Sequence, residues 1–394
     1  MVNNNGYHNG DGNGNGNGNG NGNGNRMVER VRKQRRAQKI SKIIKIAEEE
    51  IKSLHVGVLC NVYEDIGQKN LVEQDLTKVG RGIKQALEKN GHKVTFFDMN
   101  HNPLPLRKLQ KTDVDMMFNV CERINDCSLL EPHAASLLDI FEIPYTGSNP
   151  QTLALAIDKI RVKKLLNFHG IPTPNYDYIY NVDDRIRGDL KFPLIVKPAN
   201  TDNSIGITND SVVTNWEQLK KQVEYVIKKV HRPALIEEYI DGDEVDVPII
   251  GNDDKVTVLP MTKWDFTKLP EGLWHIFPFE AKWEEENSPY YNIEASRSAD
   301  LGKRLSDRIK KIAIDTYNIL DCHDYGRVEV RVDKEGNPYI LELNPNPSIG
   351  EDDCVPGAAE EIGMDYPKFI ETIVKLAINR YKKNPSYYHL QSTV

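Results

Sequence analysis

The 394-residue chain has no apolar run that approaches the roughly 20 residues needed to span a bilayer. Its five cysteines are odd in number and scattered, and the two nearest, Cys121 and Cys127, are spaced for neither a zinc site nor a redox pair. No apolar secretory segment precedes them. We therefore expect a cytoplasmic protein without a membrane span and without a metal held by cysteine.

The chain also has no excess of positive charge. Its formal net charge is -7, which argues against a protein that binds nucleic acid over its whole surface. The 39% hydrophobic and 28% charged fractions are typical of a soluble globular protein. The length exceeds what one hydrophobic core usually covers, so two or three subdomains are expected.

The N-terminal part is poor in apolar residues. Residues 1–25 alternate Gly and Asn and are predicted to be disordered, because they cannot bury enough surface to offset the ordering entropy. Residues 26–54 begin basic and carry isoleucines near helical spacing, which predicts a helix. Its charged face indicates either a solvated helix packed on the body, which the acidic Glu48–Glu50 favour, or a contact with RNA, an anionic membrane or a partner.

The rest of the chain alternates strand and helix patterns. Strands are expected at 55–60, 93–98 and 115–119, with helices between them and 143–147 closing the unit, as in an open, mainly parallel sheet. Two α+β units are expected after it, beginning with a helix over 153–167. The predicted segments are 1–25, 26–54, 55–150, 151–235, 236–385 and a tail at 386–394.

Residues 325–344 predict a β-hairpin. If 334–337 form the loop, Asp333 faces Pro338, Glu329 lies opposite Glu342, and Arg327 lies opposite Asn344. Alternation along the strands then gives an apolar opposite face. That face consists of Val328, Val330, Val332, Tyr339, Leu341 and Leu343.

Two carboxylates that face each other across strands repel by up to about 1 kcal/mol, so Glu329 and Glu342 call for a cation. Mg²⁺ is the natural candidate, because it takes one or two carboxylates and completes its octahedron with phosphate and water oxygens. The alternative is an ordinary solvent-facing hairpin in which Glu and Arg alternate for solubility. The Glu342-x-Asn344-x-Asn346-Pro347 continuation is unusual for such a strand.

The Arg-x-Glu and Glu-x-Asn pair of this hairpin resembles the metal-binding hairpin of the ATP-grasp superfamily, and of the D-alanine–D-alanine ligases in particular. Further matching segments occur in the same order over most of residues 55–385. They are Ile143–Ser148, Ala156–Lys163, Gly170–Pro174, Val196–Ala199, Glu237–Glu244, Phe279–Lys282 and Val355–Pro356. The resemblance implies an α/β (α+β) fold, with an N-terminal open parallel-sheet domain and two α+β subdomains that enclose ATP.

The resemblance also implies a set of nucleotide-binding residues. Lys159 and Lys197 match the two lysines on the nucleotide phosphates, and Ser204 lies in the loop over them. The segment made of Glu237, Glu238, Tyr239 and Ile240 matches the strand that reads adenine, and Glu244 matches the acid that binds ribose.

Metal, catalytic and substrate roles follow in the same way. Glu329, Glu342 and Asn344 correspond to the ligands of two Mg²⁺ ions, with Mn²⁺ as an alternative ion. Arg327 corresponds to the arginine that stabilises the tetrahedral intermediate, and Lys282 to a lysine on phosphate and substrate carboxylate. The substrate-binding candidates are Glu73, Glu122 and Asp353.

The chain departs from the family pattern at three places. Asp202 replaces a glycine of the phosphate loop, and Glu122 and Glu131 belong to segments that replace the pattern that holds the first amino group. Asp353 stands where the family has a serine that binds the acceptor carboxylate. If Asp353 faces the acceptor, its charge disfavours a free carboxylate unless a cation or a loop movement offsets it; the alternative is that it faces solvent.

The expected function is an ATP-dependent carboxylate-amine ligase that forms an amide bond through an acyl phosphate. The expected substrates are small amino acids or peptides, with a homodimer as one expected assembly and no nucleic acid. The alternatives are a ligase for other amino acids or peptides in specialised metabolism and a non-catalytic ATP-binding regulator.

Overall fold

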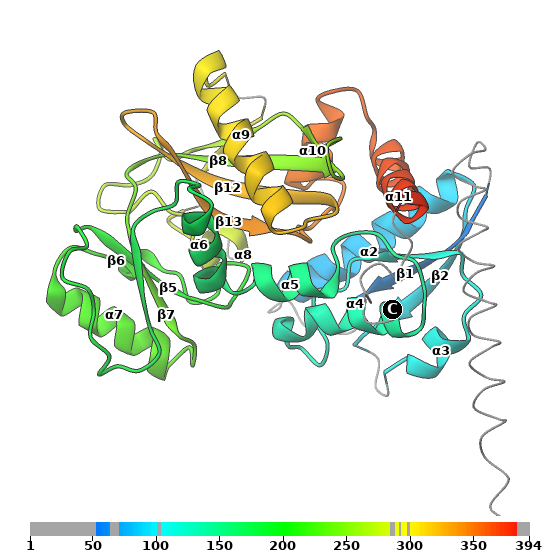
Figure 1. Ribbon diagram of the computed structural model, residues 1–394, viewed down its shortest axis with the longest axis horizontal. Coiled ribbons are helices and arrows are strands. Elements are labelled where there is room, and N and C mark those ends of the chain that lie inside the picture. Colours follow the sequence, from blue (N-terminus) through cyan, green and yellow to red (C-terminus); the bar gives the residue numbers. More distant parts are fainter. Residues whose placement is uncertain are drawn as a thin grey trace, which may run out of the picture.

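The computed structural model describes residues 53–383 except for 64–70, 101–103, 284–287, 291–292 and 298–299 (Figure 1). The predicted disordered tract at 1–25, residues 26–52 of the predicted basic helix and the tail at 386–394 therefore lie outside the described residues. The strands are β1 (His55–Cys60), β2 (Lys93–Asp98), β3 (Met116–Asn119), β4 (Tyr176–Ile179), β5 (Leu194–Pro198), β6 (Val212–Val213), β7 (Ala234–Glu238), β8 (Gly242–Gly251), β9 (Thr257–Val258), β10 (Thr262–Asp265), β11 (Glu294–Ser296), β12 (Asp324–Asp333) and β13 (Pro338–Asn344). The helices are α2 (Leu71–Lys89), α3 (Leu106–Lys111), α4 (Glu131–Ile140), α5 (Pro150–Ala156), α6 (Lys159–Phe168), α7 (Trp216–Lys228), α8 (Phe279–Trp283), α9 (Lys303–Ile319), α10 (Cys354–Glu360) and α11 (Tyr366–Lys383), with short 3-10 turns at Ser128–Leu130 and Asn209–Ser211.

The first sheet is parallel, in the order β2-β1-β3. Its strands are short apolar runs, and β1 is buried along almost its whole length because helices cover the sheet. The segment at 143–147, which the sequence predicts to close the unit, contributes one parallel bridge between Tyr145 and Met117. The predicted open parallel sheet is thus observed.

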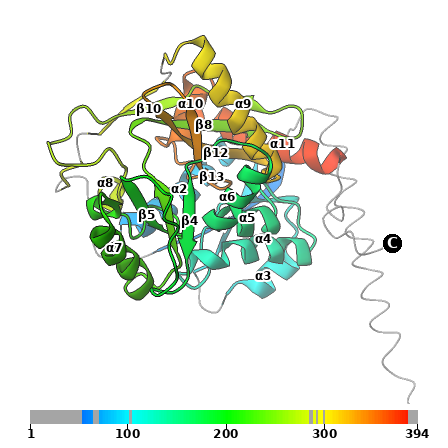
Figure 2. The ribbon, with the colours of Figure 1, turned by 60° about the vertical axis from the view of Figure 1, so that its left-hand side comes forward.

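Two antiparallel sheets follow the first. The smaller one has the order β4-β7-β5-β6 and packs its apolar residues against α7. The larger has the order β11-β10-β8-β12-β13, with β9 paired to β8. Helix α9 covers one face of the large sheet, and the subdomain of the small sheet lies on the other side (Figures 1 and 2).

The single helix predicted over 153–167 is wrong, because α5 and α6 are separate helices. Asp158 ends the first by capping the second: its side chain accepts a hydrogen bond from the backbone N–H of Arg161. The N–H of Lys159 is taken by the carbonyl of Ala199 at 2.9 Å. This break places the side chain of Lys159 at the start of α6, beside the end of β5.

The hairpin register is predicted correctly where the charged residues lie and wrongly near its loop. Arg327 pairs with Asn344 and Glu329 with Glu342, as expected, but Pro338 faces Val332 instead of Asp333. A β-bulge after Glu329 takes up the extra residue, Leu341.

The bulge also changes the apolar face of the hairpin. Val328, Val330, Val332 and Leu343 lie in the core as predicted. Ile340 is buried with them in place of Leu341, which turns toward a cavity. Tyr339 is only half-buried, and its hydroxyl donates to Asp333.

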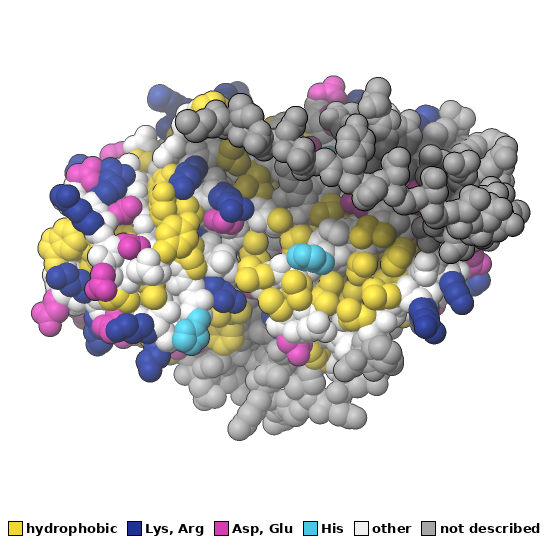
Figure 3. All heavy atoms as spheres, turned by 60° about the horizontal axis from the view of Figure 1, so that its bottom comes forward, with side chains coloured by type: hydrophobic (Ala, Val, Ile, Leu, Met, Phe, Trp, Pro, Cys, Tyr) yellow, Lys and Arg dark blue, Asp and Glu magenta, His cyan; other side chains and the backbone are white. Residues whose placement is uncertain are grey.

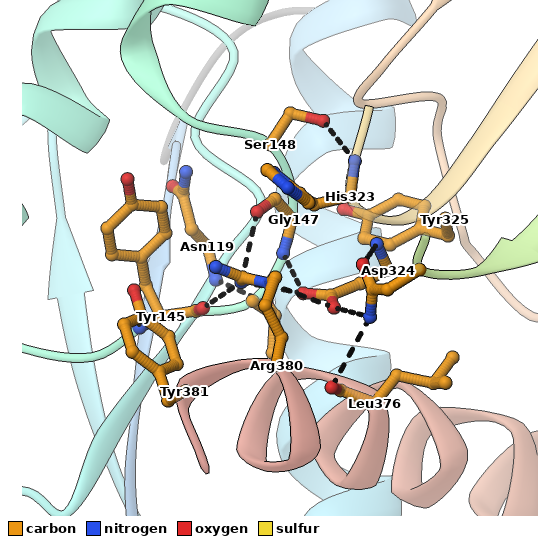
Figure 4. A network of polar contacts seen from close by, with 12 residues as sticks. Asn119, Tyr145, Gly147, Ser148, His323, Asp324, Tyr325, Leu376, Arg380 and Tyr381 are labelled. Atoms are coloured by element: carbon orange, nitrogen blue, oxygen red, sulfur yellow. Dashed lines mark hydrogen bonds and ion pairs between the residues drawn. The ribbon is translucent and has the colours of Figure 1, made fainter. Parts of the chain in front are cut away.

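Helix α11 joins the last part of the chain to the first. Its apolar residues share one core with β1, α2 and α10. Arg380 of α11 donates to the carbonyl of Tyr145 at 2.9 Å and pairs with Asp324 at 2.9 Å (Figure 4). Gly147 N–H and Asn252 Nδ2 donate to the same carboxylate, so one buried ion pair connects three parts of the chain.

The surface shows charges of both signs. On the face in Figure 3, Lys and Arg side chains are interspersed with Asp and Glu. Within the described residues, no helix is both long and apolar enough to cross a membrane.

Candidate active site

A cavity of about 620 Å³ lies between the two antiparallel sheets and under the first domain. All the predicted site residues line it except Glu73 and Lys282. The predicted site residues that line the cavity are Glu122, Lys159, Lys197, Ser204, Glu237, Glu238, Tyr239, Ile240, Glu244, Arg327, Glu329, Glu342, Asn344 and Asp353. Glu73 lies in α2 and Lys282 in α8, and their side chains are outside the described residues.

The polar face of the large sheet forms one wall of the cavity. Asp246 of β8, Glu329 of β12 and Glu342 of β13 stand in neighbouring register, so three carboxylates form a row across three strands. Arg327 pairs with Glu329 at 2.9 Å and lies 3.8 Å from Asp246. Burial disfavours the charge of Arg327, but these two carboxylates outweigh it and raise the pKa of the guanidinium.

Lys159 neutralises the third carboxylate of the row. Its ammonium lies 2.9 Å from Glu342 Oε2 and donates to the carbonyl of Thr201 at 2.7 Å. Burial opposes the charged form of Lys159, but the facing Glu342 outweighs it and raises the pKa. The lysine therefore enters the cavity as a cation.

The loop that begins at Thr201 bends over the cavity. Asn203 and Ser204 have positive φ values of 52° and 57°, and Ser204 Oγ donates to the carbonyl of Phe277 at 2.9 Å. Asp202, which stands where the family pattern has a glycine, is not among the described residues with positive φ. The left-handed turn falls on the next two residues, so the aspartate fits this loop without strain at its own backbone.

Glu237 holds two lysines at once. Its carboxylate contacts Lys163, and its Oε2 lies 3.0 Å from Lys197. The side chains of Glu237 and Lys163 are each 1% exposed, and burial alone would neutralise them. The two lysines outweigh burial and lower the pKa of Glu237, whereas burial lowers the pKa of Lys163. Glu237 therefore positions Lys197 at the cavity wall.

The sequence did not assign a role to Lys163. Lys163 lies in the matching segment Ala156–Lys163, at helical spacing from Lys159. This spacing places both lysines on one face of a helix and could have identified Lys163 as a site residue. Its further donors reach Thr173 Oγ1 at 2.6 Å and the carbonyl of Ile340 at 3.3 Å.

The end of β7 and the residues that follow it form the far wall of the cavity. The carboxylate of Glu238 accepts from Asn175 and from the backbone of Lys191, both at 2.9 Å. Tyr239 donates its hydroxyl to the carbonyl of His275 at 3.1 Å and packs edge-on against Trp274. These contacts leave the segment with an aromatic, partly apolar surface toward the cavity.

Arg331 is a second residue of the cavity that was not predicted from the sequence. It pairs with Glu244 at 3.0 Å and lies over the ring of Tyr239, with 5.6 Å between guanidinium carbon and ring centroid. It also donates to the carbonyl of Gly242 at 2.9 Å. Because Arg331 and Glu244 occupy facing positions in β12 and β8, the sheet register itself orients the acid.

The end of the cavity under the first domain is acidic. Burial, followed by the charge of Asp202, raises the pKa of Glu122 to about 8. Burial also raises the pKa of Glu131, which accepts a hydrogen bond from Asn346 at 2.8 Å. Burial and then Asp353 raise the pKa of Asp75 to about 6. A positively charged amino group would relieve this mutual repulsion.

The raised pKa of Glu122 predicts a pH effect on stability. The folded state holds a proton up to about pH 8, whereas the unfolded side chain releases it near its usual 4.5, so rising pH between these values destabilises the fold. Glu122→Gln removes this penalty. We expect the variant to melt about 2 °C or more above wild type at pH 8.5 and at the same temperature as wild type at pH 4. Thermal scans at both pH values would check this, and equal melting temperatures at pH 8.5 would contradict it.

Asp353 lines the cavity but is tied to its own loop. Its Oδ2 accepts from Ser348 Oγ at 2.6 Å and from the backbone N–H of Gly350 at 2.5 Å. The carboxylate therefore shapes the loop before α10, and its charge still lies at the acidic end of the cavity, where it raises the pKa of Asp75.

The chain is similar to known proteins over most of its length. A family model described as the D-ala D-ala ligase C-terminus matches residues 165–375. The chain belongs to the D-alanine–D-alanine ligase family. It is 28% identical over 298 residues to the D-alanine–D-alanine ligase of Aquifex aeolicus, which covers 75% of this chain and 94% of that protein. It is 32% identical to the uncharacterized protein y4sG of Sinorhizobium fredii, over 78% of this chain and 89% of that protein.

The fold agrees as well. The crystal structure of a Bacillus anthracis D-alanine–D-alanine ligase complexed with ATP matches with a TM-score of 0.66 at 23% identity, over 84% of this chain and 99% of that one. The predicted ATP-grasp fold and the D-alanine–D-alanine ligase-like family are thus confirmed. Membership of this family makes the chain an ATP-dependent ligase, which also confirms the predicted enzyme class.

Proposed function

We propose that this ligase joins two small amino acids by activating the carboxylate of one as an acyl phosphate and transferring it to the amine of the other. The observation that carries the proposal is that one cavity gathers basic side chains on one side and carboxyl groups on the other. Lys159, Lys197 and Arg327 stand on the side of the two antiparallel sheets, where polyphosphate would lie. Glu122 and Glu131 stand on the side of the first domain, where an amino group would be held.

The residues of the hairpin fit Mg²⁺. Glu329 is paired with Arg327 and Glu342 with Lys159, and Asn344 adds an amide oxygen. That oxygen accepts one hydrogen bond, from the N–H of Asn346 at 2.9 Å, and keeps a second lone pair. Two carboxylates and one amide oxygen suit an ion that takes one or two carboxylates and draws its other ligands from phosphate and water.

Mg²⁺, or Mn²⁺ in its place, would supply positive charge beside the phosphate oxygens of ATP. In the proposed first step, a carboxylate oxygen attacks the γ-phosphorus, the acyl phosphate forms and ADP leaves. In the second, an amine attacks the acyl carbon, inorganic phosphate leaves and the amine loses a proton. Lys159 and Lys197 offset the phosphate charge in the first step, and Arg327 faces the developing oxyanion in the second.

D-alanine is the first candidate for both substrates, because the matching relatives of known activity are D-alanine–D-alanine ligases. A second candidate is a ligase for another amino acid or peptide, which the acidic side chains Glu122, Glu131 and Asp353 favour. These residues replace family positions that contact the substrates. The acceptor side is therefore where this chain is expected to differ from its relatives.

The test is a screen for ADP release with ATP, Mg²⁺ and pairs of free amino acids, followed by mass determination of the product. We expect a dipeptide and one ADP for each bond formed, with D-alanine among the active substrates. ADP release without a dipeptide, or no ADP with any pair, would contradict the proposal. Omitting Mg²⁺ and adding a chelator is the control for the metal.

A further inference from the structure

Arg297 is a cavity residue that neither the sequence motifs nor the proposed mechanism uses. It follows directly on β11, at the edge of the large sheet, and its side chain is exposed. The cavity wall includes it together with Arg327, Asp352 and Asp353. Its guanidinium donates to the carbonyl of Asp352 at 3.1 Å, which places it at the loop before α10.

Arg297 differs from the other cations of the cavity in its partner. Each of the others lies against a carboxylate: Lys159 on Glu342, Lys197 on Glu237, Arg327 on Glu329 and Arg331 on Glu244. Among the cavity cations that the structure describes, Arg297 alone donates to a backbone carbonyl without an ion pair to a described carboxylate. Its charge therefore remains available to an incoming anion.

The guanidinium of Arg297 packs on α10 at Gly357. A Cβ atom added at Gly357 would lie 2.5 Å from the guanidinium carbon of Arg297 and 2.5 Å from one of its nitrogens. The arginine thus rests on α10 at a glycine, and a larger residue there would make the flexible guanidinium shift. Cys354, in the first turn of α10, is also close enough to Arg327 for that cation to lower its pKa, although burial dominates and raises it. The two arginines therefore approach the same helix.

We propose that Arg297 binds the carboxylate of the amine substrate and so offsets the repulsion expected from Asp353. The inference rests on the proposed ligase function and assigns the acceptor to a free amino acid. The amine must reach the acyl carbon near Arg327, and a carboxylate a short distance from that amine would then meet Arg297 at the α10 loop. An arginine suits this task because its planar fork can hold both carboxylate oxygens.

The test uses one reaction in which two acceptors compete. Full-length enzyme is given ATP, Mg²⁺, D-alanine and D-alaninamide, and the ratio of dipeptide to dipeptide amide is measured by mass spectrometry. We expect Arg297→Gln to lower this ratio about 10- to 100-fold, as expected for the loss of a hydrogen-bonded charge. Arg297→Lys should lower it less. Gly357→Ala should shift it in the same direction, since the guanidinium must move, while alanine suits the helix of α10.

Because both products form in the same reaction mixture, partial unfolding of a variant changes the total amount of product and leaves the ratio of dipeptide to dipeptide amide unaffected. Arg304→Gln, at an exposed arginine in α9, is the matched control and should leave the ratio unchanged. An unchanged ratio in Arg297→Gln, or a rise in the KM for ATP alone, would overturn the role of Arg297 while the ligase function stands. If D-alanine is inactive, the best free amino acid of the screen and its carboxamide take its place. If wild type releases no ADP with any pair of amino acids, the proposed function fails, and the inference fails with it.

Discussion

Glu342→Gln is expected to lower kcat by about 100-fold or more while the fold stays intact. The carboxylate has two tasks: it faces Glu329 across the hairpin, where a metal ion would bind, and it holds the ammonium of Lys159 at 2.9 Å. Glutamine keeps the volume of the side chain but removes the charge from both. Loss of one preorganised electrostatic contact commonly costs 10²- to 10³-fold in rate.

The measurement is ADP release at saturating ATP and Mg²⁺, with circular dichroism and a melting curve for each variant. Glu335→Gln in the exposed hairpin loop is the matched control, and it should behave like wild type. Wild-type turnover by a folded Glu342→Gln enzyme would remove the hairpin from the active site. A rise in the Mg²⁺ concentration needed for half activity would connect the loss to the metal.

Arg380→Met is expected to destabilise the protein by about 3–5 kcal/mol, the usual cost of leaving a buried charge without its partner. The carboxylate of Asp324 is 0% exposed and the side chain of Arg380 is 5% exposed. Two other donors, Gly147 N–H and Asn252 Nδ2, would remain on the carboxylate but carry no charge. The carbonyl of Tyr145 would also lose its donor.

Chemical denaturation with a tertiary probe checks this prediction. The double variant Arg380→Met with Asp324→Asn should recover part of the loss, because no unpaired charge then remains in the core. Arg304→Met serves as the control for a surface arginine. A loss below about 1 kcal/mol in the single variant would mean that the ion pair contributes little to holding α11 in place.

The sequence predicts the facing pairs of the hairpin because period-two alternation and a loop position determine a register. The predicted register was wrong by one residue near the loop, at Val332. The bulge at Leu341 restores the predicted register at Glu329 and Glu342. A bulge has no simple pattern in a single sequence, since it depends on what the strand packs against. The charged pairs were therefore right although the apolar face was partly wrong.

The partners of the site residues could not be predicted in this way. Lys163 orients Glu237, and Arg331 orients Glu244, each from another helix or strand. Arg297 packs on Gly357, which lies some 60 residues further along the chain. An isolated lysine or arginine in a sequence usually indicates a solvated surface. Only the sheet register and the packing of α10 place these cations at the cavity, and both are properties of the whole fold.

The place of α11 has a consequence for how the chain is made. The first sheet is synthesised early, but the helix that completes its core ends at Lys383. Contacts so distant in the chain are slow to form, because a long loop must close before they contribute. While the ribosome is still translating the central sheets, β1 and α2 therefore expose the apolar surface that α11 will later cover. The emerging chain is expected to need a chaperone, or rapid completion, at this stage more than at any other.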